Sequence, residues 1–274
     1  MSPRDARPEE PAAAVGSVEV VQSVEPETAA PAAPARPGTH FHISRRKQGD
    51  PKPHFQNFEI EVEPGATVLD ALLQIRRRHD PSLVVRHSCM HAACGTCGVR
   101  INGREALACD TKLATLPTHK PIKVEPLANQ RPVADLATDM VDFYARLDAA
   151  AMPLLRASET AGGATPPENI KAFARFENCI ECGLCLSACP IARTNHDYIG
   201  PAALAAAARV VEEPRRHDLG PVLALAAEPD SAWRCRDAIE CTAVCPSSVD
   251  PARALLTLRR HVAANGARRF LARR

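Results

Sequence analysis

The eleven cysteines of this 274-residue chain limit what it can fold into more than any other feature. They form three groups, within residues 89–109, 179–189 and 235–245, and short gaps separate most neighbours within each group. In a reducing cytosol such clustering is typical of metal ligands or redox groups, and an odd total disfavours complete disulfide pairing. We therefore expect a chain built around bound inorganic groups.

The first group has the pattern Cys-x4-Cys-x2-Cys with a more distant fourth cysteine, which is the plant-type spacing for a [2Fe-2S] cluster. Gly95 and Gly98 let the backbone bend closely round the sulfides and leave amides free to hydrogen-bond them. Zinc is the alternative, but it usually takes two pairs of ligands. A Rieske centre needs two histidines on one iron, and no Cys-x-x-His follows the fourth cysteine. The predicted [2Fe-2S] ligands are Cys89, Cys94, Cys97 and Cys109.

The second group reads Cys-x2-Cys-x2-Cys-x3-Cys-Pro, the bacterial ferredoxin run in which three cysteines bind one [4Fe-4S] cluster and the fourth binds another cluster. The third group has the same frame, except that Ala238 stands where the second cysteine would be. Exchanging the last cysteine of each run gives one complete site and one site with three thiolates, which suits a [3Fe-4S] cluster. The predicted [4Fe-4S] ligands are Cys179, Cys182, Cys185 and Cys245. The predicted [3Fe-4S] ligands are Cys189, Cys235 and Cys241.

The first half of the chain has the pattern of a small sheet wrapped on one helix. Residues 1–38 form a Pro/Ala-rich tail with little to bury, which we expect to be disordered. Residues 39–132 alternate apolar and polar positions as strands do, and Thr67 opens an apolar-faced helix through Arg78. The Asn102-Gly103 dipeptide predicts a hairpin turn between two short strands, and a further strand is expected over residues 121–125.

Residues 133–274 are helical in character. The segment ADLATDMVDFYARL, residues 134–147, has apolar residues at helical spacing, and an Ala-rich stretch from Pro201 is expected to be helical up to a break at Pro214. The last segment reads as a basic helix. Its arginines, Arg259 and Arg260 among them, are expected on a solvated face, with contact to a partner or to lipid headgroups as the alternative.

Composition excludes several classes of protein. A formal net charge of +2, from 34 basic and 32 acidic side chains, gives no overall field for nucleic acid. The first residues lack the layout of a secretory or organelle-targeting segment, and no apolar stretch approaches the roughly 20 residues that a membrane span needs. No G-x-G-x-x-G motif is present, so we expect any flavin to be bound by another chain.

At this point the sequence resembles the iron-sulfur subunit of succinate dehydrogenase and fumarate reductase. The resemblance covers about residues 40–265. It is carried by sequence segments such as TVLDALLQIRRRHDPSLVVRHSC, CGTC, LATDMVDFY, CIECGLCLSACP, YIGPAAL and CTAVCP. It implies an α+β chain, with an N-terminal β-grasp domain of the plant-type [2Fe-2S] ferredoxin kind followed by an all-α helical ferredoxin domain. It further implies a FAD-containing flavoprotein partner and electron flow through the [2Fe-2S], [4Fe-4S] and [3Fe-4S] centres to a quinone. The quinone would be held by a membrane anchor subunit, which places this chain peripherally on the cytoplasmic side of the plasma membrane, with no catalytic residue of its own.

One departure from the family pattern concerns the quinone. Many ubiquinone-linked members carry tryptophan shortly after the Pro that follows the second run, and histidine after the first cysteine of the third; here these stretches read IARTNH and Arg236. This favours menaquinone or a fumarate-reductase-like relative. Local ion pairing and packing explain the candidate quinone-proximal residues about equally well. These candidates are Arg193, Trp233, Arg234 and Arg236.

Two other functions stay open on the sequence alone. The first is an equivalent subunit of another flavoprotein dehydrogenase or of a thiol-linked fumarate reductase. The second is a structural zinc protein without a redox role, which would contain zinc and no labile sulfide.

Overall fold

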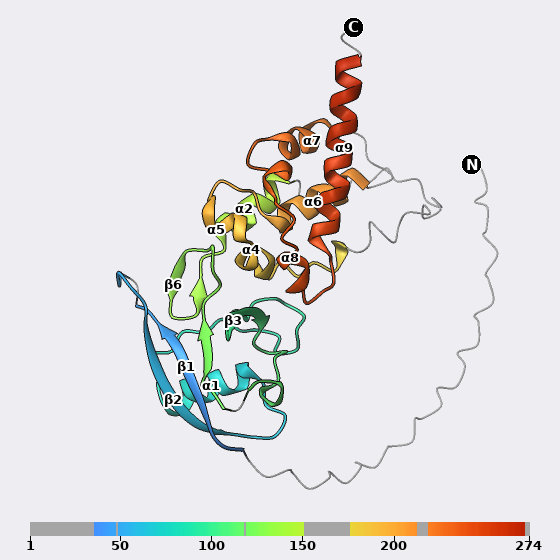
Figure 1. Ribbon diagram of the computed structural model, residues 1–274. Helices are drawn as coiled ribbons and strands as arrows, with labels where there is room; N and C mark the ends of the chain where they lie inside the picture. The colour runs from blue at the N-terminus through green and yellow to red at the C-terminus, as the bar shows by residue number, and fades with distance from the viewer. Residues whose placement is uncertain (1–35, 48, 118, 151–175, 213–218, 272–274) are drawn as a thin grey trace, which may run out of the picture. The chain divides into compact units, whose positions relative to one another are not determined.

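The computed structural model describes residues 36–47, 49–117, 119–150, 176–212 and 219–271 (Figure 1). Residues Pro34–Arg274 form one compact unit. The predicted Pro/Ala-rich tail lies, up to residue 35, outside the described residues.

A five-stranded mixed sheet forms the first part of this unit. Its strands lie in the order β2-β1-β5-β3-β4, where β1 and β5 run parallel and the other neighbours antiparallel. Alternating residues such as Phe41 and Ile43 are fully buried on one face, as the sequence pattern predicts. The strands are β1 (Arg36–Arg45), β2 (His54–Val62), β3 (Gly98–Ile101), β4 (Arg104–Leu107) and β5 (Ile122–Glu125).

The helix α1 (Val68–Arg78) covers the buried face of the sheet. Thr67 accepts a hydrogen bond from the backbone N–H of Asp70, and the Asp70 side chain accepts one from the N–H of Thr67, which is a reciprocal capping box. The buried side of α1 joins the sheet in one hydrophobic core, which includes Leu69 and Leu72. The predicted helix and its start at Thr67 are therefore confirmed.

The predicted hairpin is also confirmed. Strands β3 and β4 pair antiparallel, and Asn102 and Gly103 between them have φ values of 51° and 86°. Two consecutive positive φ values are the backbone of a type I′ turn, which suits Asn-Gly and the right-handed twist of the strands. The hairpin brings the residues before β3 next to those after β4.

The prediction of a helix over residues 134–147 is wrong for the first half of this segment. Residues Pro132–Ala134 (β6) and Ala137–Thr138 (β7) form a small antiparallel hairpin, and the helix α2 begins only at Val141 and ends at Ala149. At the turn, Asp135 has a φ of 43° and its backbone N–H donates to the carbonyl oxygen of Arg46 at 2.8 Å. Tertiary contacts of Asp135 thus override the helical periodicity of the segment.

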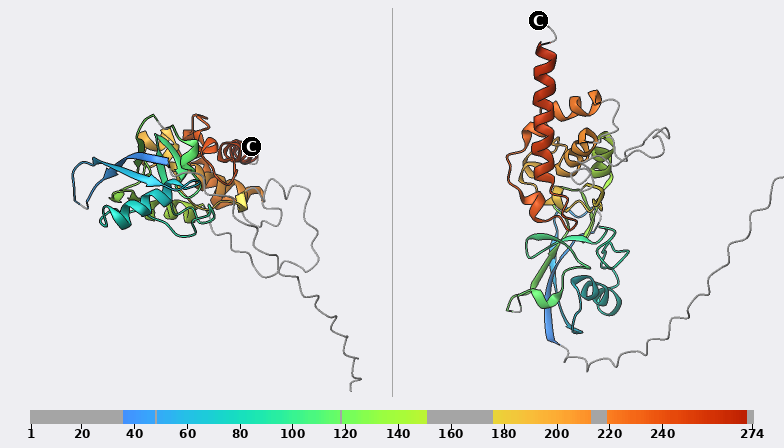
Figure 2. Two further views of the ribbon diagram at one scale, coloured as in Figure 1. Left: turned by 90° about the horizontal axis from the view of Figure 1, so that it is seen from below. Right: turned by 90° about the vertical axis from the view of Figure 1, so that its right-hand side faces the viewer.

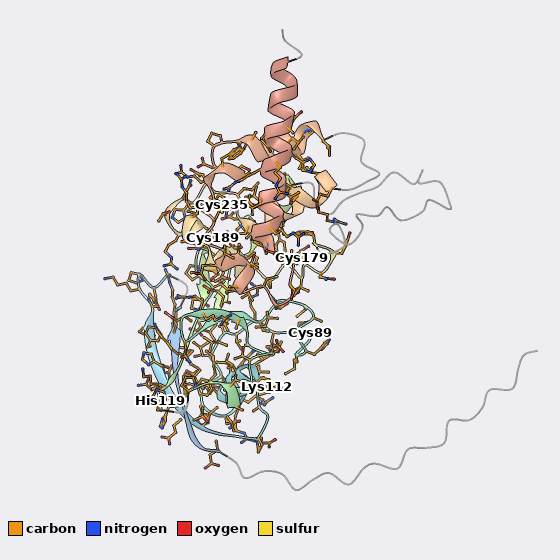
Figure 3. The ribbon with its side chains drawn as sticks, turned by 45° about the vertical axis from the view of Figure 1, so that its right-hand side comes forward. Cys89, Lys112, His119, Cys179, Cys189 and Cys235 are labelled. Atoms are coloured by element: carbon orange, nitrogen blue, oxygen red, sulfur yellow. The ribbon has the colours of Figure 1, made fainter. Side chains whose placement is uncertain are left out.

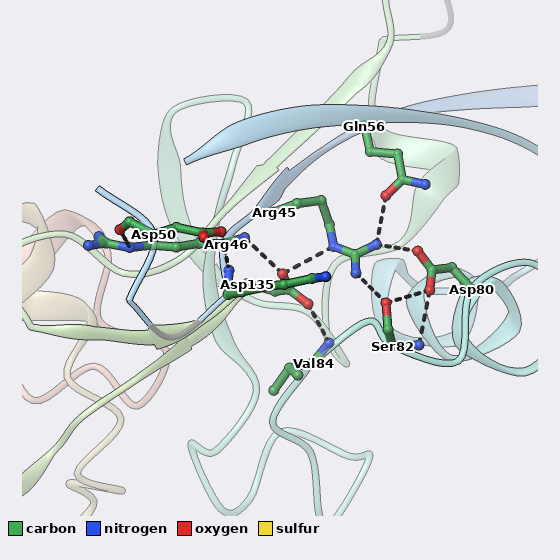
Figure 4. Close-up of polar contacts among 9 residues, drawn as sticks. Arg45, Arg46, Asp50, Gln56, Asp80, Ser82, Val84 and Asp135 are labelled. Carbon is green, nitrogen blue, oxygen red and sulfur yellow. Dashed lines mark hydrogen bonds and ion pairs between the residues drawn. The ribbon is translucent and has the colours of Figure 1, made fainter. Parts of the chain in front are cut away.

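A buried charge network fixes this turn (Figure 4). The carboxylate of Asp135 accepts backbone N–H groups from Arg46 at 2.9 Å and Val84 at 2.8 Å. The Arg45 guanidinium lies 3.1 Å from the same carboxylate and also donates to Asp80 at 2.6 Å and Ser82 at 2.8 Å. The side-chain hydrogen bonds from Ser82 and Arg45 lower the pKa of Asp80 far below its usual value. The network joins the end of β1, the loop after α1 and the turn before α2.

The described residues after β7 form short helices and one long helix (Figures 1 and 2). The predicted Ala-rich helix is α6, which ends at Glu212, and it lies beside the long C-terminal helix α9. Among the described residues, none of the helices is both long and apolar enough to span a lipid bilayer. The helices are α4 (Leu184–Ala188), α5 (Pro190–Thr194), α6 (Pro201–Glu212), α7 (Gly220–Ala227), α8 (Glu240–Ala243) and α9 (Pro251–Leu271), with single 3-10 turns at Leu113–Thr115 and Ala232–Arg234.

Replacing Asp135 with asparagine tests the charge network. The amide keeps the shape of the side chain but loses the charge opposite Arg45 and one of the two acceptors for backbone N–H groups. Breaking a buried ion pair from one side costs roughly 3 kcal/mol, so we expect Asp135→Asn to lower the free energy of unfolding by about that amount. Urea titration followed by circular dichroism measures it. Asp148→Asn, on the exposed side of α2, is the control; equal stability of the two variants would contradict the role given to Asp135.

Candidate iron-sulfur sites

The first cysteine group lies on the loop before β3 and at the end of β4. Pairing of Gly98 with Leu107 in the hairpin brings Cys97 next to Cys109, and the N–H of Cys109 points at the Cys97 sulfur at 3.5 Å. The loop curls tightly because Met90 and Ala92 have left-handed φ values of 64° and 62°. The structure therefore brings together Cys97 and Cys109, the consecutive predicted [2Fe-2S] ligands with the longest stretch of chain between them.

Backbone amides and burial give this group the character of a thiolate site. The N–H of Ala92 donates to the sulfur of Cys109 at 3.2 Å. The backbone N–H of His91, followed by the thiol of Cys94, lowers the pKa of Cys89 to about 7. Burial raises the pKa of Cys97 to about 12. Amide donors aimed at sulfur are what iron-bound thiolates require, so the residues present fit a small iron-sulfur cluster.

A hollow of about 390 Å³, partly open to solvent, collects the second set of thiols. Burial raises the pKa of Cys182 to about 11 and that of Cys185 well above its ordinary value, with the other thiols of the set as further causes. The apolar side chains of Phe143, Phe176 and Val249 complete the walls. The cysteines that line this hollow are Cys179, Cys182, Cys185 and Cys245.

A second hollow, of about 360 Å³, collects the remaining thiols. Ala238 and Ile239 line it, and both Asp237 and Ile239 have left-handed φ values, of 55° and 63°. The N–H of Asp237 donates to the sulfur of Cys235 at 3.3 Å. Burial, followed by the charges of its two neighbours, raises the pKa of Cys241 to about 11. The cysteines that line this hollow are Cys189, Cys235 and Cys241.

A bend at Cys189 separates neighbouring cysteines of one run into different hollows. In Figure 3, Cys189 lies beside Cys235, and Cys179 lies apart from both. Cys189 ends α4 and also precedes α5, whose first residue is Pro190, and its backbone is extended with φ −72° and ψ 117°. Proline suits the first turn of a new helix but cannot continue the old one. Cys185 on α4 therefore faces one hollow, while Cys189 after the bend faces the other.

The donor set of both hollows fits iron-sulfur clusters. The sulfurs lie in apolar surroundings with N–H donors such as that of Val249, 3.4 Å from the Cys245 sulfur. Bound iron would displace the protons that burial otherwise keeps on these thiols, because thiolate is the binding form. Within the described part of the chain, no three His, Cys, Asp or Glu side chains are arranged to hold a single metal ion.

Arg259 on α9 is a site residue that the sequence patterns did not reveal. Its side chain is only 14% exposed, so its expected place on a solvated face is wrong. Its guanidinium donates to the carbonyl oxygens of Ala232 at 3.0 Å and Cys235 at 2.7 Å, and it pairs with the Asp237 carboxylate at 3.0 Å. Arg259 also lies over the ring of Trp233, 5.6 Å from its centroid. One side chain thus fixes the loop that presents Cys235.

Three of the candidate quinone-proximal residues flank Cys235 in sequence, and Arg193 follows Cys189 on α5. Trp233 is 50% exposed and contacts Arg259. Arg234 pairs with Asp230 at 3.7 Å, and Arg236 is exposed between Cys235 and Asp237. Arg193 is exposed in the last turn of α5. Their role toward a quinone stays a prediction.

Replacing Arg259 with methionine tests its hold on the Cys235 loop. The variant keeps the length of the side chain but leaves two carbonyl oxygens and the Asp237 carboxylate without their donor. Hydrogen bonds to a charged group contribute roughly 1.5–3 kcal/mol each, so we expect the iron bound by the third group to be lost to a chelator at least several-fold faster. Iron release and the decay of the EPR signal measure this rate. Arg260→Met, on the exposed neighbouring residue, is expected to behave like the unmutated protein; equal rates for both variants would refute the role of Arg259.

Two domain families match the chain in the order in which the sites occur. Residues 40–145 match a family described as 2Fe-2S iron-sulfur cluster binding domain, and residues 175–249 match one described as 4Fe-4S dicluster domain. The first range contains the cysteines of the hairpin site and the second contains the cysteines that line both hollows. The described fold therefore carries its cysteines inside the parts that these families share.

Similar proteins are known from several bacteria. A fumarate reductase iron-sulfur subunit of Mycobacterium tuberculosis is 37% identical over 221 residues, covering 78% of this chain and 89% of that protein. A fumarate reductase iron-sulfur subunit of Escherichia coli is 36% identical, covering 75% and 85%. A succinate dehydrogenase iron-sulfur subunit of Coxiella burnetii is 36% identical, covering 80% and 94%. Among solved structures, a chain of the Mycobacterium smegmatis Sdh1 complex in the apo form has the same fold, with a TM-score of 0.75 at 23% identity, covering 84% of this chain and 97% of that one.

Proposed function

Because this chain belongs to the family of iron-sulfur subunits of succinate dehydrogenase and fumarate reductase, we propose that it relays electrons between the FAD of a flavoprotein subunit and a membrane quinone. The observation that carries the proposal is the division of the cysteines. Four lie around the β3–β4 hairpin, four line one hollow and three line the other. Three separate thiolate sites in one small chain are suited to passing electrons onward.

The chain's own contribution is to hold and insulate the redox groups. Bound iron-sulfur clusters supply one-electron chemistry. Around them, the hairpin and its curled loop fix the first set of thiolates, and the bend at Cys189 distributes the second run between two hollows. Backbone N–H groups such as those of Ala92 and Asp237 stabilise negative charge on sulfur. The apolar walls of the four-cysteine hollow, which include Phe143 and Phe176, restrict the access of water to the ligands.

We assign [2Fe-2S] to the first group, [4Fe-4S] to the hollow lined by four cysteines and [3Fe-4S] to the hollow that Ala238 lines. In this proposal residues 39–132 form the β-grasp ferredoxin domain and residues 133–274 the all-α helical ferredoxin domain. The sheet order and the bends between short helices support these assignments. Substrate chemistry belongs to the flavoprotein, so no residue of this chain is catalytic.

The quinone end of the relay lies at the third group in this proposal. A membrane anchor subunit would bind the quinone there and hold the complex on the cytoplasmic side of the plasma membrane. The exposed Trp233 and Arg236, next to Cys235, support this side as the exit. The absence of histidine after Cys235 favours menaquinone.

Low-temperature EPR with metal and sulfide analysis tests the three assignments together. The oxidised complex is expected to show a [3Fe-4S] signal, and dithionite is expected to add the signals of reduced [2Fe-2S] and [4Fe-4S] clusters. Succinate added to the complex is expected to reduce at least one cluster through the flavoprotein. Zinc without labile sulfide would refute the redox role. Reduction by a substrate other than succinate, with succinate inert, would assign the chain to another dehydrogenase.

Replacing Ala238 with cysteine tests the three-ligand site. The new thiol would stand on the wall of the hollow that holds only Cys189, Cys235 and Cys241 among its lining cysteines. We expect it to hold a fourth iron, so that the [3Fe-4S] signal of the oxidised protein is lost and iron content rises by one per chain. Ala238→Ser has nearly the same size but a poorer ligand, and it is expected to retain the [3Fe-4S] signal. An unchanged signal in Ala238→Cys would place the missing ligand elsewhere.

A further inference from the structure

Gly95 lies where the first cysteine loop meets the second. It is buried between Cys94 and Cys97 and has a left-handed φ of +71°. A Cβ atom added to it would lie 2.7 Å from the carbonyl oxygen of Ile180 and 2.8 Å from the Cβ of Cys182. Side-chain atoms do not fit at such distances, so the two ligand loops touch through bare backbone at this point.

Gly98 extends the same contact. A Cβ atom there would lie 3.2 Å from a methyl carbon of Leu184 and 3.3 Å from the carbonyl oxygen of Cys182. The segment from Ile180 to Leu184 therefore crosses both glycines of the first loop. Cys182, which lines the four-cysteine hollow, is the ligand of that hollow in contact with Gly95.

A buried polar junction holds the two loops in this position. The hydroxyl of Ser187, on α4 and fully buried, donates to the Glu105 carboxylate at 2.9 Å and accepts the N–H of Ala128 at 2.8 Å. The side-chain amide of Asn129 donates to the carbonyl oxygens of Leu186 and Ser187 at 2.9 Å and of Cys189 at 3.0 Å. Separating α4 from the sheet would leave these polar groups without partners, which is costly for buried groups.

We infer that Gly95 is a positioning residue for electron transfer between the [2Fe-2S] and [4Fe-4S] sites, and that the electron crosses where Gly95 contacts Cys182. The inference rests on the proposed function, since it requires both clusters. The step moves one electron: the reduced [2Fe-2S] cluster is oxidised, the [4Fe-4S] cluster is reduced, and no bond or proton is transferred. Reduced flavin supplies the electron in the complex, and dithionite can replace it. The rate of electron tunnelling falls steeply with distance. The absence of a side chain at Gly95 keeps the distance between the [2Fe-2S] and [4Fe-4S] sites short.

The test compares Gly95→Ala with Gly65→Ala in the full complex reduced by dithionite. Gly65 lies in the turn before α1, outside the cysteine groups. Both positions have a positive φ, of 71° and 83°, so both variants carry the same kind of backbone strain, but nothing lies within 4 Å of a Cβ at Gly65. Two reduced clusters close together broaden each other's EPR signals, and this magnetic interaction weakens with the cube of their separation. We expect Gly95→Ala to lose part of the broadening while both signals keep their integrated intensity, and Gly65→Ala to match the unmutated complex.

The outcomes separate this inference from the proposed function. Unmutated protein without the two signals would refute the proposed function itself. Full broadening in Gly95→Ala would overturn the role of Gly95 alone. If Gly95→Ala fails to bind the first cluster, Gly98→Ala decides, because Gly98 has no positive φ and meets Cys182 at a less severe 3.3 Å. Full broadening in Gly98→Ala, or loss of its [2Fe-2S] signal as well, would show that these glycines serve the first loop only and would overturn the inference.

Discussion

The attachment of α4 to the polypeptide that follows β5 is the interaction on which the rest of the structure depends. A helix of five residues is far too short to be stable by itself in water. Asn129 satisfies carbonyl oxygens at its C-terminal end, and Ser187 joins its buried side to Glu105 on β4. Leu184 inserts into the core of the sheet, so α4 belongs to both hydrophobic cores at once. The stability of α4 therefore comes from its contacts with neighbouring elements, and the helix connects the sheet to the helical part.

Two of the three thiolate sites depend on α4, because ligands of both sites lie on this short helix and at its end. Cys185 lies on the helix and Cys189 at the bend that ends it, and Pro190 makes the bend obligatory. The sheet contributes its own site through a tight hairpin, and Gly95 places that site against the second loop. The order of the sites along the unit is thus set by backbone contacts, and the apolar side chains that line the hollows insulate the sites.

Sequence patterns predicted the parts of the fold that local physics controls. The capping box at Thr67, the Asn102-Gly103 turn and the cysteine spacings each depend on residues within a few positions of one another. The helix predicted from residue 134 failed at its start because the Asp135 carboxylate binds backbone groups that are 89 and 51 positions away in sequence. The contact of Arg259 with the Cys235 carbonyl, 24 positions away, likewise has no local signal. The sequence pattern around a basic residue on a helix is the same whether its side chain faces solvent or a loop that carries cluster ligands.

The buried alanines of α6 affect how the helical part of the chain is stabilised. Ala202, Ala203 and Ala205–Ala208 are all buried, yet a methyl group removes little apolar surface from water. Small side chains let α9 approach α6 closely, and large apolar residues such as Tyr198, Leu204 and Leu258 complete the core of the helical part. Among the described residues, the buried core of the helical part contains ten alanines, whereas the core of the sheet contains two. Bound clusters would therefore contribute a larger share of the stability of the helical part, and their insertion would be a step of folding as much as a step of maturation.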